Sequence, residues 1–497
     1  MSVVKRFVSD TVIYGFTTIL SRMLNFVLTP FFVRKFEASI YGVFTNLFAI
    51  ASMVNAVLAF GMETTFFRYL QKVEGDRSKV FDNSFFITLI TTALFLLTAF
   101  TFTEPIAHWL SRGEAQEIQD YVSYVKLFAV ILAADAIAVV PFAKLRAEGQ
   151  AKRYGFIKVL NILIFVGFNF FLLYWLPEWN KGSEFWRNFS AGWFRENWLG
   201  NVFISNLIAS VVTLFLVLPQ LLSFKFKIDG KLLKDMMAYT FPILIANISF
   251  IINENLDKIM FPRLLTGEQG EEDLGVYGAV AKLAVFLQLF VTAFRLGAEP
   301  FFFSYAKNEN ARKTYALIME YFVIAMVIVM VGICANVDWL KGFIRGSEDQ
   351  QAVYWSGLAI VPVLLFNYVL LGIYMNLSVW YKLSDQTRYG LYISGIGAII
   401  TIILNFMLIP TYSYWGAALS TTATYVVMVG LSYVWGQKNY SIPYDAKKIG
   451  LYLLAGIVIS VLAYQANFWI GNLLLIAFLA GIAYLEKGSL MKIIKRR

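Results

Sequence analysis

The sequence predicts an all-α protein that crosses a membrane many times, and three observations support this fold class. Of the 497 residues, 59% are hydrophobic and 15% are charged, which is more apolar surface than soluble domains can bury. Apolar stretches of the roughly 20 residues that span a hydrocarbon core recur along the whole chain. In addition, the stretch 41–69 reappears as 277–305, which indicates a duplicated chain.

About fourteen apolar stretches are long enough to be membrane-spanning helices. In chain order they are 8–33, 40–69, 81–108, 118–145, 153–176, 199–223, 235–262, 274–303, 313–336, 352–380, 388–409, 414–435, 447–466 and 468–486. The period-two alternation that membrane β-barrels show is missing from these stretches. The sequence therefore predicts a polytopic helical membrane protein.

The duplicated stretches align without a gap. The matches least expected by chance are a Tyr-Gly pair and a Gly-x-Glu: Tyr41-Gly42 with Tyr277-Gly278, and Gly61 and Glu63 with Gly297 and Glu299. The second copy comes six expected spans after the first, so both copies enter the membrane in the same direction. We therefore predict two parallel six-helix repeats, related by an axis along the membrane normal.

The duplication also predicts where the domains begin and end. We expect an N-terminal lobe at 1–223 with helices 1–6, and a C-terminal lobe at 235–436 with helices 7–12. A basic cytoplasmic linker, 224–234, joins them. Residues 437–497 add two helices and a basic cytoplasmic tail that have no counterpart in the first half.

The distribution of Lys and Arg predicts the orientation in the membrane. If the N-terminus is inside, the inside connections carry about three times as many Lys and Arg as the outside ones. Both termini are therefore expected to be cytoplasmic. The net charge of +10 is explained by this topology and by contact with lipid headgroups, so no nucleic-acid partner is expected.

Three groups of residues give the chain a family resemblance. They are Ser21-Arg22, then Asn255-Leu256-Asp257-Lys258 followed by Val276-Tyr277-Gly278, and then Asn405 with Ile409-Pro410 and Trp415-Gly416-Ala417-Ala418. In this order they resemble the multidrug/oligosaccharidyl-lipid/polysaccharide (MOP) flippase superfamily, and within it the flippases of O-antigen and capsule assembly. The resemblance implies a V-shaped two-lobed transporter whose central cavity opens alternately to each side.

The same resemblance implies roles for individual residues. Similarity to the lipid II flippases suggests that Arg22 and Lys282 bind the pyrophosphate of the substrate, although relatives tend to carry arginine at the second position. It also implies a sodium site formed by four residues of three helices: Asp257, Thr401, Asn405 and Thr421. The neutral Asn405 stands where relatives place an acid, which puts ion coupling by sodium or a proton in doubt.

Elementary electrostatics adds further candidates. A charge at bilayer depth costs about 2.5 to 3.5 kcal/mol, so such side chains should face water or one another. The candidates are Arg22, Asp135, Glu254, Asp257, Lys258, Lys282 and Arg295. We interpret Arg22, Lys282, Arg295 and Lys258 as cations that bind the substrate. Lys282 and Arg295 are separated by roughly 20 Å of helix, so they would be successive stations for one pyrophosphate.

The alternative for these charges is internal pairing. Glu254 precedes Lys258 by four residues, a spacing at which opposite charges pair readily. An Asp257–Lys258 pair is expected to be geometrically poor, because neighbouring side chains on a helix point about 100° apart. We therefore place Asp257 with Glu254 in the ion-coupling set. The equivalent carboxylates Glu63 and Glu299 are either gate residues or side chains that snorkel to the interface.

The resulting functional prediction is a transporter of the inner membrane rather than an enzyme. Its substrate would be a polyprenyl-pyrophosphate-linked oligosaccharide, an O-antigen or capsule repeat unit, and polysaccharide polymerase machinery is a candidate partner. An ion-coupled multidrug exporter and a lipid II flippase are alternatives of the same fold. A membrane glycan polymerase or ligase needs a sizeable outside catalytic loop, which the sequence lacks, and a structural scaffold would not explain the deep charges. No cofactor is expected beyond a coupled ion.

Overall fold

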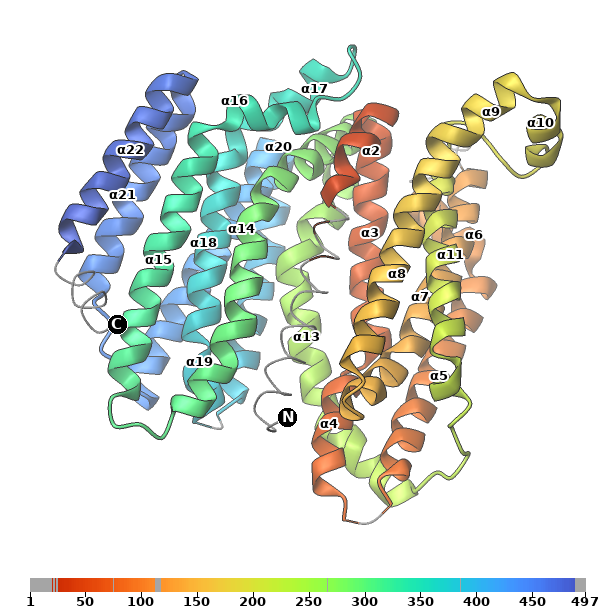
Figure 1. Cartoon of the computed structure of the whole chain (residues 1–497), viewed down its shortest axis with the longest axis horizontal. Helices are drawn as coiled ribbons and strands as arrows, with labels where there is room; N and C mark the ends of the chain where they lie inside the picture. The colour runs from red at the N-terminus through yellow and green to blue at the C-terminus, as the bar shows by residue number, and fades with distance from the viewer. Residues whose placement is uncertain are drawn as a thin grey trace. The chain divides into compact units, whose positions relative to one another are not determined.

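The computed structural model describes residues 26–74, 76–111, 118–265, 267–384 and 386–487, together with Leu20 and Met23. Throughout these residues all regular secondary structure is helical (Figure 1). Within the same ranges, eleven helices are long and apolar enough to cross a membrane. In lipid a helix satisfies its backbone polar groups internally, which is why such apolar runs fold this way. The predicted fold class is confirmed.

The difference between eleven spans and the expected fourteen has three sources. Most of the first expected span, 8–33, lies outside the described residues. The apolar helix α11 (Gly200–Leu216) is shorter than a typical span. The element α20 (Arg388–Asn439) consists of two helices joined at a break at Ser413, so it covers two expected spans. The count of fourteen remains a prediction.

The chain forms two compact units, which we call unit 1 (Met1–Phe31 with Asn46–Ile259) and unit 2 (Phe32–Thr45 with Met260–Arg497). Three helices contribute residues to both units: α2 (Thr29–Lys35), α3 (Ala38–Ala59) and α13 (Gly230–Leu264). Most of α13 belongs to unit 1, although the duplication assigns this segment to the second lobe. The lobe boundaries expected from the duplication stay a prediction.

Unit 1 is built around the long helix α7, whose side chains are largely buried. Helices α5, α6, α8 and α11 pack against α7. Aromatic rings fill the space between α7 and α11, where the Phe128 and Phe203 centroids are 4.7 Å apart. The helices that lie wholly in unit 1 are α4 (Met62–Lys72), α5 (Ser78–Thr101), α6 (Thr103–Leu110), α7 (Ile118–Ala147), α8 (Ala151–Phe170), the π-turn η1 (Phe171–Trp175), α9 (Leu176–Gly182), α10 (Glu184–Ser190), α11 and α12 (Leu218–Leu221).

Unit 2 is built around α15 and α18. Helix α15 packs against α18, α21 and α22, and α18 packs against α14 and α20 (Figure 1). The helices that lie wholly in this unit are α14 (Gln269–Tyr305), α15 (Ala311–Ala335), α16 (Val337–Leu340), the 3-10 turn η2 (Lys341–Ile344), α17 (Gln351–Ser356), the 3-10 turn η3 (Gly357–Ile360), α18 (Val361–Leu377), α19 (Val379–Leu383), α20, α21 (Ala446–Gln465) and α22 (Phe468–Leu485).

Two expected helices have unexpected internal geometry. The expected helix 40–69 is two helices, α3 and α4, because Phe60 and Gly61 adopt left-handed backbone angles. Gly61 tolerates this conformation without a Cβ penalty. In α20 the break lies at Ser413, with φ of 47°, three residues after Pro410. This break separates the expected spans 388–409 and 414–435.

The duplicated Tyr-Gly pairs lie close to the place where α3 and α14 cross within unit 2. A Cβ atom on Gly42 would lie 1.8 Å from the carbonyl oxygen of Glu271, and one on Gly275 would lie 1.8 Å from that of Ala38. Small residues let helix backbones approach this closely in membranes. Gly42 of the first copy lies in this tight crossing together with Gly275, which precedes the second copy. Gly278 of the second copy faces Thr45, whose Oγ1 would lie 2.6 Å from an added Cβ.

Candidate functional site

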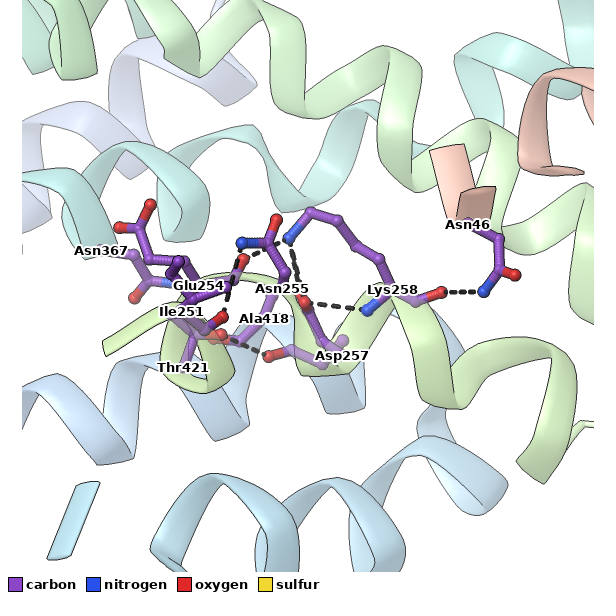
Figure 2. Close-up of polar contacts among 10 residues, drawn as sticks. Asn46, Ile251, Glu254, Asn255, Asp257, Lys258, Asn367, Ala418 and Thr421 are labelled. Atoms are coloured by element: carbon purple, nitrogen blue, oxygen red, sulfur yellow. Dashed lines mark hydrogen bonds and ion pairs between the residues drawn. The ribbon is translucent and has the colours of Figure 1, made fainter. Parts of the chain in front are cut away.

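The charged run of α13 forms a compact cluster in unit 1. The Asp257 side chain is buried, with 3% of its surface exposed. Its carboxylate accepts hydrogen bonds from the Lys258 backbone N–H at 2.8 Å and from Lys258 Nζ at 2.9 and 3.2 Å. The same ammonium group donates to the Glu254 backbone carbonyl at 2.8 Å. Figure 2 shows Lys258 curled back along the helix toward these two acceptors.

This geometry corrects the expectation that Asp257 and Lys258 pair poorly. The argument from diverging side-chain directions holds for Cβ atoms, but the lysine stem is four carbons long and flexible. It carries Nζ back over one turn, so Asp257 and Lys258 form an ion pair with Nζ 2.9 Å from Oδ1. Asp257 is thus held beside a positive charge.

Asn46 connects this cluster to α3, and sequence reasoning gave it no role. Its amide Nδ2 donates to the Lys258 backbone carbonyl at 2.9 Å, and its side chain is buried (Figure 2). A buried amide side chain in an apolar run normally has a hydrogen-bond partner, so the presence of Asn46 in this run already indicated a polar contact. The sequence could not indicate that the partner lies on α13.

A second polar cluster lies between the two halves of α20 in unit 2. Thr401 and Asn405 are four residues apart on one half, and Ser420 and Thr424 are four apart on the other, so each pair shares a helix face. All four side chains are at most 2% exposed. Thr401 and Thr424 join the two faces through an Oγ1–Oγ1 distance of 3.1 Å. Ser420 and Thr424 were missed from the sequence.

Two members of this cluster carry unsatisfied polar atoms. Neither the Oδ1 nor the Nδ2 atom of Asn405 has a hydrogen-bond partner in the described part of the chain, and the same holds for Oγ of Ser420. Buried unpaired polar groups are costly and call for an explanation. Oxygen donors of this kind suit a hard cation such as sodium.

The four residues expected to bind sodium belong to different units. Thr401, Asn405 and Thr421 offer neutral oxygens in unit 2, and Asp257, the one carboxylate, lies in unit 1, so the sodium site stays a prediction. Thr421 Oγ1 donates to the Ala417 carbonyl at 3.1 Å, which leaves its lone pairs available. Among the described residues, no three His, Cys, Asp or Glu side chains form a metal-binding group.

Asn367 is a further polar contact of α20 that sequence reasoning missed. Its Nδ2 donates to the Ala418 carbonyl at 3.0 Å, and its Oδ1 accepts from Thr422 Oγ1 at 2.6 Å. Asn367 thereby fixes the beginning of the second half of α20 to α18.

The two cations of α14 lie at different places along one helix in unit 2. Both Lys282 and Arg295 are half-buried. Arg295 Nη1 lies 3.5 Å from Sδ of Met375 in α18, and among the described residues no carboxylate forms an ion pair with it. A cation at this depth without an anionic partner is suited to a charged ligand. The roles of both residues in substrate binding remain predictions.

The remaining candidates are placed as follows. In unit 1, Glu63 in the first turn of α4 forms an ion pair with Arg146 of α7, and both side chains are partly exposed. Glu299 lies in α14, but its side chain is not among those described. Arg22 lies outside the described residues. The gate role of Glu63 and Glu299 and the cavity role of Arg22 therefore stay predictions.

Comparison with known proteins identifies the family of this chain. The profile of the family described as "polysaccharide biosynthesis protein" matches residues 7–305. The chain belongs to this family. It is accordingly a member of the MOP flippase superfamily, as the sequence resemblance predicted. The MatE family profile also matches, over residues 242–407. No curated protein sequence matches the chain.

Solved structures of superfamily members share the fold of this polysaccharide-family transporter. The lipid II flippase MurJ in its inward closed conformation has a TM-score of 0.71 and 14% identity, covering 96% of this chain and 100% of that one. An inward-facing multidrug resistance MATE family transporter has a TM-score of 0.62 and 15% identity, covering 87% and 95%. A MOP superfamily transporter from Pyrococcus furiosus has a TM-score of 0.59 and 14% identity, covering 92% and 96%.

Proposed function

We propose that this MOP-superfamily transporter flips a polyprenyl-pyrophosphate-linked oligosaccharide, an O-antigen or capsule repeat unit, across the inner membrane by alternating access. The observation that carries the proposal is Arg295, a half-buried cation within a membrane helix that has no carboxylate partner among the described residues. Such a charge costs about 2.5 to 3.5 kcal/mol at bilayer depth. A pyrophosphate ligand offsets that cost through charge-assisted hydrogen bonds.

The match to the polysaccharide biosynthesis family supports the glycan class of the substrate. A lipid-linked glycan also suits a path with several cations, since its pyrophosphate is the most highly charged part of the molecule. Arg22, Lys282, Lys258 and Arg295 are the residues that we assign to this path. In the proposed orientation both termini are cytoplasmic, and the polysaccharide polymerase machinery receives the product outside.

Ion coupling would act through Asp257, which is already paired with Lys258. A sodium ion bound at Asp257 would compete with the Lys258 ammonium for the same carboxylate. Lys258 thus acts as an exchangeable counter-ion in the proposed cycle. Because the expected set holds one carboxylate, sodium binds weakly unless Lys258 moves away.

A multidrug exporter of the same fold is the second candidate, because the MatE profile matches residues 242–407. Such an exporter binds organic cations, for which an acidic cavity is expected. Lys282 and Arg295 on α14 would repel that ligand. Lipid II flipping would use the same pyrophosphate chemistry, with a different glycan.

The test is reconstitution of the purified full-length protein into liposomes that contain a lipid-linked repeat unit with a labelled sugar. Glycan exposure to an outside lectin or glycosidase is followed over time, with protein-free liposomes as the control. Translocation of the polyprenyl-pyrophosphate substrate at several times the background rate is expected. Export of an organic cation such as a rhodamine dye, without glycan translocation, would overturn the proposal in favour of multidrug export.

A further inference from the structure

A cavity of about 430 Å³ lies within unit 1, where α3, α5 and α13 meet. This volume falls in the range of small-molecule binding sites. Its lining residues come from the segments 53–60, 91–95 and 248–251, all of which belong to unit 1. Thr91 is the one polar residue that lines it, and Oγ1 of Thr91 already donates to the Thr88 carbonyl at 3.1 Å. The lining that the structure describes is therefore apolar and uncharged.

The cavity lies at the depth of the hydrocarbon core. Thr91 is close to the middle of α5, about 20 Å along the helix from its first residue, Ser78. Because the hydrocarbon core is about 30 Å thick, both headgroup layers are distant from this point. Two of the lining residues, Val57 and Leu94, are exposed, so the cavity is open to its surroundings. A ligand that reaches the cavity at this depth has to be apolar.

Phe60, at one end of the cavity, has an unusual backbone conformation. Its φ of 48° is left-handed, which is rare for a bulky residue, and such residues cluster where ligands are held. The next residue, Gly61, lets α13 approach, since an added Cβ would lie 3.2 Å from Cγ2 of Ile243. The hydroxyl oxygens of Thr65 and Thr240 are 2.7 Å apart and join α4 to α13. This end of the cavity is thus fixed by close contacts.

A second apolar cavity, of about 150 Å³, adjoins the first. Val54 and Phe95 line both cavities, so these two side chains lie between them. The second cavity continues along α3 to Leu47 and reaches Leu110 of α6. From Leu58 to Leu47 the two linings follow α3 for roughly 17 Å. Together the cavities form an elongated apolar track inside unit 1.

We propose that the larger cavity binds part of the polyprenyl chain of the lipid-linked substrate. This proposal rests on the proposed function and assigns the apolar part of the substrate to unit 1. A glycan or a pyrophosphate at this depth would leave its polar groups unpaired against an uncharged lining, at a high cost. A hydrocarbon chain instead gains dispersion contacts in a cavity that excludes water. The polyprenyl chain is the hydrocarbon that the proposed function requires the transporter to carry.

The experiment labels the purified full-length protein in detergent with a farnesol analogue that carries a photoreactive diazirine. Labelled peptides are identified by mass spectrometry, and labelling is expected within 53–60, 91–95 or 248–251. A long-chain polyprenyl phosphate should compete at a concentration about tenfold lower than phosphatidylglycerol, which corresponds to about 1.4 kcal/mol of preference. Phosphatidylglycerol represents the bulk lipid that could fill the same cavity.

Val54→Trp tests the site by filling the space between the two cavities. Its ring occupies the volume of several methylene groups of the chain, so labelling should fall by about tenfold or more. Val130→Trp is the matched control, because Val130 lies in α7, is exposed and lines neither cavity. This control should be labelled in the cavity as the wild type is.

Phe95→Ala is the sharper variant, because a disrupted fold would not reproduce its effect. Removing the ring opens the larger cavity into the smaller one, so a longer chain gains apolar contacts. The preference for geranylgeraniol over farnesol as a competitor should therefore rise by about tenfold relative to the wild type.

Three results would count against parts of this reasoning. Wild-type labelling of Val54→Trp, together with an unchanged chain-length preference in Phe95→Ala, would overturn the chain site. Equal competition by phosphatidylglycerol and the polyprenyl phosphate would assign the cavity to bulk lipid and refute its role in substrate binding. If the cavity binds polyprenyl chains selectively but the protein flips no lipid-linked glycan in liposomes, the proposed function fails and the chain site stands.

Discussion

Replacing Gly275 with alanine tests whether the glycine crossing in unit 2 holds α3 and α14 together. The added Cβ would lie 1.8 Å from the Ala38 carbonyl oxygen, whereas an ordinary contact begins at 3.4 Å. The backbones must therefore separate by about 1.6 Å, since the atom that is struck belongs to a backbone rather than a flexible side chain. Overpacking of this kind costs about 1 to 3 kcal/mol.

Gly430 in α20 provides the matched control. A Cβ at Gly430 meets no atom within 4 Å, so alanine there should stabilise the helix by about 1 kcal/mol through its higher propensity. The two Gly→Ala substitutions are thus expected to shift stability in opposite directions. A double variant, Gly42→Ala with Gly275→Ala, should cost less than the sum of the two single changes, because the first already opens the crossing.

The assay is thermal unfolding of each purified variant in the same detergent, followed by tryptophan fluorescence or by the loss of the monodisperse peak. Gly275→Ala should unfold at a lower temperature than the wild type, and Gly430→Ala at an equal or higher one. If Gly275→Ala is as stable as Gly430→Ala, the close crossing is not a determinant of the fold.

Three further predictions concern charges. Arg22→Ala should abolish surface glycan in cells while the protein still reaches the membrane, and Arg22→Lys should restore part of it if charge matters more than the planar fork. Asp257→Asn should remove any sodium or proton dependence of translocation in liposomes, whereas Lys258→Met should strengthen sodium dependence by leaving the carboxylate uncompensated. Burial alone would raise the pKa of the Glu486 carboxyl, but hydrogen bonds from Lys448 and Tyr452 lower it below its ordinary value. The ionised carboxylate therefore stabilises the fold at pH values above its unfolded pKa, which is about 4.3. This stabilisation is lost as the pH falls through the lower pKa of the folded state. The melting-temperature difference between wild type and Glu486→Gln should therefore shrink in acid.

Each of these predictions has a contradicting result. Normal glycan export by Arg22→Ala would remove Arg22 from the substrate path. Gradient dependence that persists in Asp257→Asn, or that is missing from the wild type, would show that Asp257 is not the coupling residue. A difference between wild type and Glu486→Gln that stays constant from neutral pH to below about 4 would mean that the Glu486 carboxylate contributes no charge-dependent stability.

The fold could be predicted from the sequence because it depends on local properties. Apolar runs of sufficient length become helices in lipid whatever their neighbours are. Two spans were expected around Ser413, and α20 does consist of two helices there. The contact between Thr401 and Thr424 across the break, however, could not be predicted from the local pattern. Gly61 shows the reverse case, since an apolar run with no proline is interrupted by a left-handed pair.

The candidate site was less predictable because its contacts join distant segments. Asp257 and Lys258 could be named from the sequence, but their pairing depends on how far a lysine stem folds back. Phe60 and Ile248 gave no signal at all, since only the packing of α3, α5 and α13 brings them to one cavity with Thr91. Residue type and spacing cannot encode such long-range proximity.

The charged residues of the membrane helices differ in what offsets the free-energy cost of burying their charge, and this difference indicates different roles. In unit 1, Asp257 pairs with Lys258 and Glu63 pairs with Arg146, so each charge is offset by the chain itself. The buried Asp257–Lys258 pair can report on conformation, because breaking it leaves a buried carboxylate uncompensated, at a cost of several kcal/mol. Arg295 of unit 2 has no carboxylate partner among the described residues, and a ligand of opposite charge would offset its cost. Conformational coupling is therefore best sought on α13, and substrate binding on α14.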